Sequence, residues 1–199
     1  MATQPRWSLL SVEDYLQLDS NSFETRYEYV DGYVRMLSGG TANHATIGLN
    51  VASILRDLLR GSPCRAFNSD LRVQVSETRY FYPDVTVSCD ERDRGQTDMI
   101  RSPRLVIEVL STSTEAHDRG KKFSYYRQCP TIQEYVLINT EYPAVEVFRH
   151  EKNSLWTFHA FGPDDEVKLA SIAVHFPVAA VYEDVEFPPE HEDTDFTPA

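Results

Sequence analysis

The sequence lacks the long apolar run that a membrane-spanning helix requires, since no stretch approaches the roughly 20 residues needed. The segment from Met1 to Trp7 also lacks the apolar stretch of a secretion signal. Glycine and proline, at 8 and 11 residues, are too few for a fibrous or low-complexity protein. We therefore expect a cytoplasmic protein that does not associate with a membrane.

Cysteine is scarce as well, with three residues at positions 64, 89 and 129. Their number is odd, and no two of them have the short spacing of a paired motif. This pattern is typical of a reducing cytoplasm, and it argues against a disulfide framework and against a zinc ion held by cysteine.

Basic residues are outnumbered, because 19 Lys and Arg stand against 31 Asp and Glu and give a net charge of −12. Such a balance argues against nucleic acid as a partner, since phosphate binding needs local positive charge. However, residues 183–199 carry seven of the acids and no base, whereas residues 56–127 hold thirteen bases and eleven acids. The middle of the chain could therefore accept an anion.

Apolar residues make up 41% of the 199 positions, which is enough to bury a sizeable core. No internal repeat or Gly/Ser linker divides the chain. We predict one domain over residues 1–187 and an acidic disordered tail over residues 188–199.

Helical and strand patterns are interspersed along the chain. Ser11 suits the N-cap of a short helix, and Asp31-Gly32 suits the turn of a hairpin. Strand patterns occupy residues 27–30, 33–36, 71–75, 85–88, 105–110, 134–138, 145–149 and 155–159, and helical patterns occupy residues 11–16, 41–60 and 118–128. Residues 89–102 are highly charged and predict an exposed loop.

The run 105–110 is almost entirely apolar, which is typical of a central strand covered on both faces. With the helix and strand that follow it, this run predicts a right-handed crossover between parallel strands. We predict an α/β or α+β fold in which helices flank a mixed central sheet, with an N-terminal hairpin and a C-terminal antiparallel extension. No Gly-rich loop opens a helix after a strand, which disfavours dinucleotide and Walker-type phosphate sites.

Glu108 is the strongest single indication of chemistry, because it stands alone in this apolar strand. A buried carboxylate costs several kcal/mol unless a cation or hydrogen bonds compensate it. The residue is therefore either a metal ligand or general base, or a partner in a structural ion pair.

Asp84 follows Pro83 at the start of an alternating strand, where an aspartate is commonly a turn residue. Its interest lies in a pairing with Glu108, because two carboxylates at the ends of neighbouring strands can hold one hard divalent cation.

Lys122 lies on the basic helix that follows, four residues after Asp118 and four before Tyr126, so the three share one face. A lysine beside two metal-binding carboxylates suits phosphodiester hydrolysis, although a solvated basic face is the commoner use of such a helix. Glu28 on the hairpin and His44 near the start of the long helix are weaker candidates.

Short motifs follow one another in a fixed order along the chain, at Arg26–Gly32, His44, Ser69–Val73, Tyr82–Val85, Leu105–Ser111, Asp118–Lys122, Tyr126 and Glu134–Tyr135. This ordered set resembles the Uma-type family of restriction endonucleases, within the PD-(D/E)XK restriction-endonuclease-like superfamily. The resemblance runs from about Ser11 to about Val185.

This resemblance implies a restriction-endonuclease-like sheet and Mg²⁺, with Mn²⁺ as a substitute, held by Asp84 and Glu108. The superfamily's lysine should lie two residues after the second acid, where this chain has Leu110. Lys122 would then supply the ammonium, with Lys121 as its alternative. In the endonuclease hypothesis, Glu28 and His44 are the candidates that complete the site.

The first hypothesis is therefore a metal-dependent endonuclease that hydrolyses DNA, and a homodimer would be compatible with it. Two alternatives stay open. One is a catalytically inactive module that binds nucleic acid or protein, which the acidic total charge favours. The other is a hydrolase of smaller phosphate esters, which would need no DNA groove.

Overall fold

The computed structural model describes residues 9–152 and 154–187. The elements follow in the order α1 (Val12–Asn21), β1 (Tyr27–Val30), β2 (Tyr33–Met36), α2 (Ala42–Leu58), β3 (Arg65–Asn68), β4 (Arg72–Ser76), β5 (Arg79–Phe81), β6 (Val85–Ser88), η1 (Glu91–Asp93), β7 (Met99–Ile100), β8 (Pro103–Val109), α3 (Glu115–His117), η2 (Asp118–Lys122), α4 (Phe123–Tyr126), β9 (Glu134–Ile138), β10 (Val145–His150), β11 (Trp156–Phe161), β12 (Glu166–Leu169), η3 (Ala170–Ile172), β13 (Val174–Pro177) and α5 (Val178–Val181). The predicted tail over residues 188–199 lies outside the described residues, so the division into one domain and a tail stays a prediction.

A six-stranded sheet forms the centre of the fold, with the strand order β11-β10-β9-β8-β6-β3. Strands β8 and β9 are parallel, and the other neighbouring pairs in this sheet are antiparallel. All of β9 and nearly all of β8 is buried. The predicted mixed sheet, its buried central strand and its C-terminal antiparallel pair are thus confirmed.

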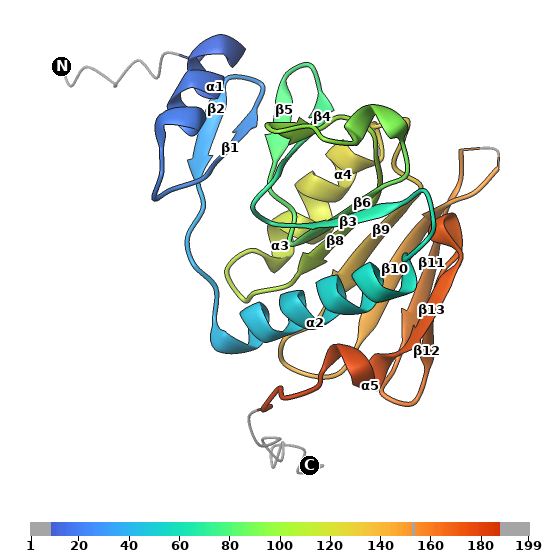
Figure 1. The fold of residues 1–199 in the computed structure, drawn as a ribbon. Coiled ribbons are helices and arrows are strands. Elements are labelled where there is room, and N and C mark those ends of the chain that lie inside the picture. Colours follow the sequence, from blue (N-terminus) through green and yellow to red (C-terminus); the bar gives the residue numbers. More distant parts are fainter. Residues whose placement is uncertain (1–8, 153, 188–199) are drawn as a thin grey trace, which may run out of the picture.

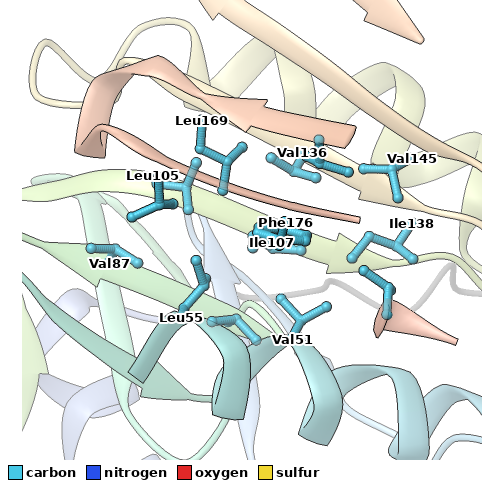
Figure 2. Packing of buried hydrophobic residues seen from close by; sticks show 14 of the residues in the cluster. Val51, Leu55, Val87, Leu105, Ile107, Val136, Ile138, Val145, Leu169 and Phe176 are labelled. Atoms are coloured by element: carbon cyan, nitrogen blue, oxygen red, sulfur yellow. The ribbon is translucent and has the colours of Figure 1, made fainter. Parts of the chain in front are cut away.

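Each face of this sheet packs against a different apolar layer. One face meets α2, the small sheet β12-β13 and α5, and the other meets α4 and strands β4, β5 and β7. Figure 1 shows α2 crossing one side of the sheet and α4 lying on the other. In Figure 2, Val51 and Leu55 of α2 point toward Ile107 of β8. Burying a side chain of this size contributes about 1.5–3 kcal/mol.

Helix α2 has the limits that the sequence predicts. The hydroxyl of Thr41 accepts a hydrogen bond from the backbone N–H of His44, which caps the first turn. Gly61, with φ of +78°, follows the last turn. His44 is therefore fixed at the helix start, above the end of the central sheet.

The helical segment between β8 and β9 differs from the prediction of one helix over 118–128. It begins at Glu115, because Ser111 and Thr114 already form a turn, and it ends at Tyr126. Its middle part, η2, is a π-helical turn. Such bulges in helices are frequent at functional sites.

The N-terminal hairpin belongs to a second sheet of five strands, in the order β2-β1-β5-β4-β7. Asp31 and Gly32 form its turn, and both have positive φ, as the sequence predicts. The predicted helix at Ser11 is also confirmed, since the Ser11 side chain accepts from the Asp14 N–H at the start of α1.

The prediction of an exposed loop over residues 89–102 is wrong for part of that segment. Met99 and Ile100 form the buried strand β7, which pairs in parallel with β4. Asp93 is buried as well. The cost of burying its carboxylate is offset by hydrogen bonds that it accepts from Ser88 and from the backbone N–H groups of Arg101 and Ser102. Charged neighbours concealed this short apolar pair in the sequence.

The prediction that the cysteines form no disulfide is also wrong, since Cys64 and Cys89 are bonded. They flank β3 and β6, and the register of these strands pairs Arg65 with Ser88. Extending that register by one residue places the two cysteines opposite each other, with a Cα–Cα distance of 3.9 Å. Two cysteines separated by 25 residues form no local pattern, so the sequence did not predict this disulfide. Cys129 is free and buried.

Within the described residues, no helix combines the length and apolar character needed to cross a membrane.

Candidate functional site

A cleft of about 830 Å³ opens at one end of the central sheet. The five residues singled out in the sequence all line it: Glu28 of β1, His44 of α2, Asp84 before β6, Glu108 of β8 and Lys122 of η2. They come from five separate segments, which only the folded chain brings together.

The pairing of β6 with β8 explains why Asp84 and Glu108 meet. Val85 is opposite Ile107, so the continued register places Asp84 opposite Glu108. Side chains in such opposed positions have Cβ atoms about 4.5–5.5 Å apart. The backbone N–H of Val109 donates a hydrogen bond to Oδ2 of Asp84 over 2.7 Å, which fixes that carboxylate at the end of the strand.

Glu108 is buried in contact with two donors. Lys122 Nζ lies 3.0 Å from its Oε1, and the hydroxyl of Tyr126 donates to the same oxygen over 2.8 Å. Both donors come from the helical segment after β8, at the spacing that the sequence indicated. The structure thus contains the ion pair that was the alternative role for Glu108, but it places this pair in the wall of a cleft.

The ammonium of Lys122 serves three buried carboxylates. Besides Glu108, its Nζ lies 2.9 Å from Oε1 of Glu28 and 3.7 Å from Oδ1 of Asp118. The side chains of all four residues are at most 7% exposed. When all three carboxylates are ionised, one positive charge among three negative charges leaves a surplus that a further cation would balance.

The pKa values of these residues reflect their burial first and the neighbouring charges second. Burial raises the pKa of Glu108 from 4.5 to about 8, and the charges of Asp118 and Asp84 add to the rise, while Lys122 opposes it. Burial also raises the pKa of Asp118. For Lys122, burial favours the neutral amine, but the carboxylates of Glu108, Glu28 and Asp118 outweigh it and raise the pKa.

His44 interacts with the outer acid of the site. Its Nε2 lies 3.4 Å from Oδ2 of Asp84, and a hydrogen bond to Asp84 is the main reason why the pKa of the imidazole is raised. A protonated His44 therefore offsets part of the negative charge beside Asp84.

The oxygens that remain free determine whether a metal ion fits. The contacts of Asp84 fall on Oδ2 and those of Glu108 on Oε1, so each carboxylate keeps one oxygen without a hydrogen-bond partner among the described residues. Within those same residues, no group of three or more His, Cys, Asp or Glu side chains is arranged to hold a metal ion by itself. Mg²⁺ needs fewer protein ligands than such a group offers, because it commonly takes one or two carboxylates and completes its shell with water and substrate phosphate. The donor set fits that cation.

Asp118 and Tyr126 belong to the site although the sequence suggested no role for them beyond a shared face with Lys122. Their spacing of four residues on either side of the lysine was the available signal. The basic helix is solvated only in part, since Lys122 is buried and Arg119 pairs with Glu115 and Glu146, whereas Lys121 and Arg127 are exposed.

Glu134 shows what a structural glutamate looks like in the same sheet. It is fully buried at the first position of β9, where it accepts hydrogen bonds from Arg149 and from the backbone N–H groups of Ala170 and Ser171. Unlike Glu108, it has donors for both oxygens, and it does not line the cleft.

Comparisons with known proteins agree with this fold. The family model described as "Uma2: Putative restriction endonuclease" matches residues 12–181. Two uncharacterized proteins of Synechocystis sp. are similar to the chain. One, slr1290, is 37% identical over 179 residues and aligns 89% of this chain with 94% of its own. The other, sll1609, is 30% identical over 171 residues, covering 83% of this chain and 96% of its own.

A solved structure also has this fold. It is described as a putative nuclease belonging to DUF820 from Anabaena variabilis. Its TM-score is 0.73 at 20% sequence identity, with 87% of this chain and 98% of that chain covered. The predicted restriction-endonuclease-like fold is thus confirmed.

Proposed function

Because this chain belongs to the Uma2 family of putative restriction endonucleases, we propose that it is a metal-dependent endonuclease that hydrolyses phosphodiester bonds in DNA. The observation that carries the proposal is the meeting of Asp84, Glu108 and Lys122 in one cleft. Two carboxylates and an ammonium group from three segments match the needs of phosphodiester hydrolysis.

Asp84 and Glu108 are proposed to hold Mg²⁺ or Mn²⁺ through their free carboxylate oxygens. When bound, such a cation polarises the phosphate and makes a coordinated water more acidic. The Val109 N–H keeps Asp84 in place for this role, and the Tyr126 hydroxyl does the same for Glu108.

Lys122 is proposed to stabilise the negative charge that develops on the phosphoryl oxygens. Its charge is secured by the three carboxylates around it, and Glu28 holds the ammonium from the side of the hairpin. His44 is proposed to orient Asp84 through their contact.

DNA in the cytoplasm is the proposed substrate. The acids that line the cleft would repel a phosphate backbone in the absence of a cation. Metal should therefore be needed both for the scissile phosphate to approach Asp84 and Glu108 and for its hydrolysis.

The test is conversion of supercoiled plasmid to nicked or linear DNA in Mg²⁺, in Mn²⁺ and in EDTA. We expect cleavage by the wild type only with a divalent metal, and a loss of at least about a hundredfold in Glu108→Gln and Lys122→Met. Glu134→Gln is the matched control, because it changes a buried glutamate of the neighbouring strand outside the cleft; assayed below its melting temperature, it should retain cleavage. Cleavage in EDTA, or equal loss in all three variants, would contradict the proposal.

A further inference from the structure

A second hollow of about 350 Å³ lies between the hairpin β1-β2 and the helical segment that carries Lys122. Its volume falls within the roughly 300–1,000 Å³ that is usual for small-molecule sites. Glu28 and Arg35 line both this pocket and the cleft. The pocket therefore adjoins the position proposed for the scissile phosphate.

One wall of the pocket is a single face of the hairpin. Glu28 is opposite Arg35, and Val30 is opposite Tyr33. Residues two apart on a strand and their cross-strand partners share one face, so these four side chains form one surface. All four line the pocket.

The facing wall is one side of the helical segment. His117, Lys121 and Tyr125 follow one another at intervals of four residues and line the pocket together. Phe81 stacks with the ring of Tyr125, and the Arg79 guanidinium lies 4.4 Å from that ring's centroid, so this part of the wall is firmly supported.

Two cations in the pocket have no acidic partner. Arg35 and Lys121 are exposed, and within the described part of the chain neither side chain forms an ion pair or a hydrogen bond. Two acids line the pocket and both are engaged elsewhere, Asp31 by Arg79 and Thr78 and Glu28 by Lys122. In a protein with a net charge of −12, two such cations from different elements indicate an anionic ligand.

An aromatic surface accompanies these cations. Tyr33 is 66% exposed, although it stands in a strand beside the pocket. An exposed ring beside two cations suits a nucleotide, because nucleobases stack on aromatic side chains while phosphates bind Arg and Lys.

We propose that this pocket binds the nucleotide next to the cleaved bond on a single DNA strand. Its phosphate would lie between Arg35 and Lys121, and its unpaired base against Tyr33. The proposal rests on the proposed endonuclease function. It gives Lys121 a role in binding the substrate strand, distinct from the role of Lys122.

The test measures binding rather than cleavage, by fluorescence anisotropy of a labelled single-stranded 12-mer in EDTA at several salt concentrations. Lys121→Ala and Arg35→Ala should each lower the affinity and make the slope of log K against log salt shallower by about 0.7, as expected for the loss of one phosphate contact on a single strand. Tyr33→Ala should weaken binding by about fivefold or more without changing that slope.

Matched controls lie elsewhere on the surface. Lys168 on β12 is exposed, Tyr142 is 57% exposed, and neither lines the two hollows. Lys168→Ala and Tyr142→Ala should bind as the wild type does. The proposal also predicts that one abasic position in the probe weakens binding by the wild type but not by Tyr33→Ala.

Three outcomes would contradict the proposal that this pocket binds DNA. They are unchanged binding in the three pocket variants, equal loss of affinity in pocket and control variants, and no binding by the wild type at low salt. Pocket-dependent binding by a protein that does not cut plasmid would support the pocket and contradict the endonuclease function. Cleavage with pocket-independent binding would do the reverse.

Discussion

Replacing Glu108 by glutamine should stabilise the metal-free protein, although it removes one partner of an ion pair. The pKa of Glu108 rises from 4.5 to about 8 on folding, mainly because the carboxyl group is buried. At about 1.4 kcal/mol per pH unit, keeping this group ionised in the fold costs about 5 kcal/mol. Glutamine keeps the shape and can still accept the Tyr126 hydrogen bond, but it carries no charge.

The sign of the pH dependence follows from proton binding. Between pH 4.5 and 8 the folded state binds more protons at Glu108 than the unfolded state does. The free energy of unfolding of the wild type therefore falls as pH rises through this window. In EDTA, Glu108→Gln should exceed the wild type by little near pH 4.5 and by roughly 3 kcal/mol at pH 7.

A bound divalent cation should cancel most of this difference in stability at pH 7. It binds only the folded state and stabilises the wild type by about 2.7 kcal/mol at a hundred times its Kd. Glu108→Gln weakens a ligand and should lose most of that gain.

The assay is thermal unfolding of both proteins from pH 5 to pH 8, in EDTA and over a range of Mg²⁺ concentrations. Glu134→Gln is the control and should be less stable than the wild type at every pH, because two backbone N–H groups and Arg149 lose a charged acceptor. If Glu108→Gln is also less stable at every pH, and Mg²⁺ shifts neither protein, Glu108 is a structural ion-pair partner. The inactive binding module would then be the better hypothesis.

Three further predictions concern stability. Lys122→Met leaves three buried carboxylates without their ammonium and should cost about 3–5 kcal/mol in EDTA by urea unfolding, whereas an unchanged midpoint would show that they share no charge network. Asp19→Asn breaks the buried pair with Arg72 and should cost a similar amount, so a loss below about 1 kcal/mol would mean that this pair does not hold α1 to the second sheet. Reduction by dithiothreitol should lower stability by about 3–4 kcal/mol, because the bond between Cys64 and Cys89 closes a loop of 25 residues, and Cys64→Ser should not respond to the reductant.

Local patterns in the sequence predicted most of the elements. The cap at Ser11, the turn at Asp31-Gly32 and the apolar run around Glu108 each depend on neighbours within a few residues. Such signals are visible in a single chain, because caps, turns and buried strands have their own residue preferences.

Features that depend on the register between distant strands could not be predicted in this way. Cys64 and Cys89 meet because β3 pairs with β6, and Arg35 lies opposite Glu28 because of the hairpin register. The buried strand at Met99 was hidden by charged neighbours. Residue chemistry and the family resemblance suggested that Asp84 and Lys122 act together, but no local pattern spans their separation of 38 residues.

The proposed function requires that Asp84 and Glu108 hold a divalent cation beside Lys122. Crystals soaked in Mn²⁺ test it directly, because anomalous scattering locates the ion without reference to activity. We expect one strong anomalous peak at coordination distance, about 2.0–2.2 Å, from an oxygen of Asp84 and an oxygen of Glu108, and no such peak in Glu108→Gln crystals. A peak away from both carboxylates, or none at saturating Mn²⁺, would contradict it.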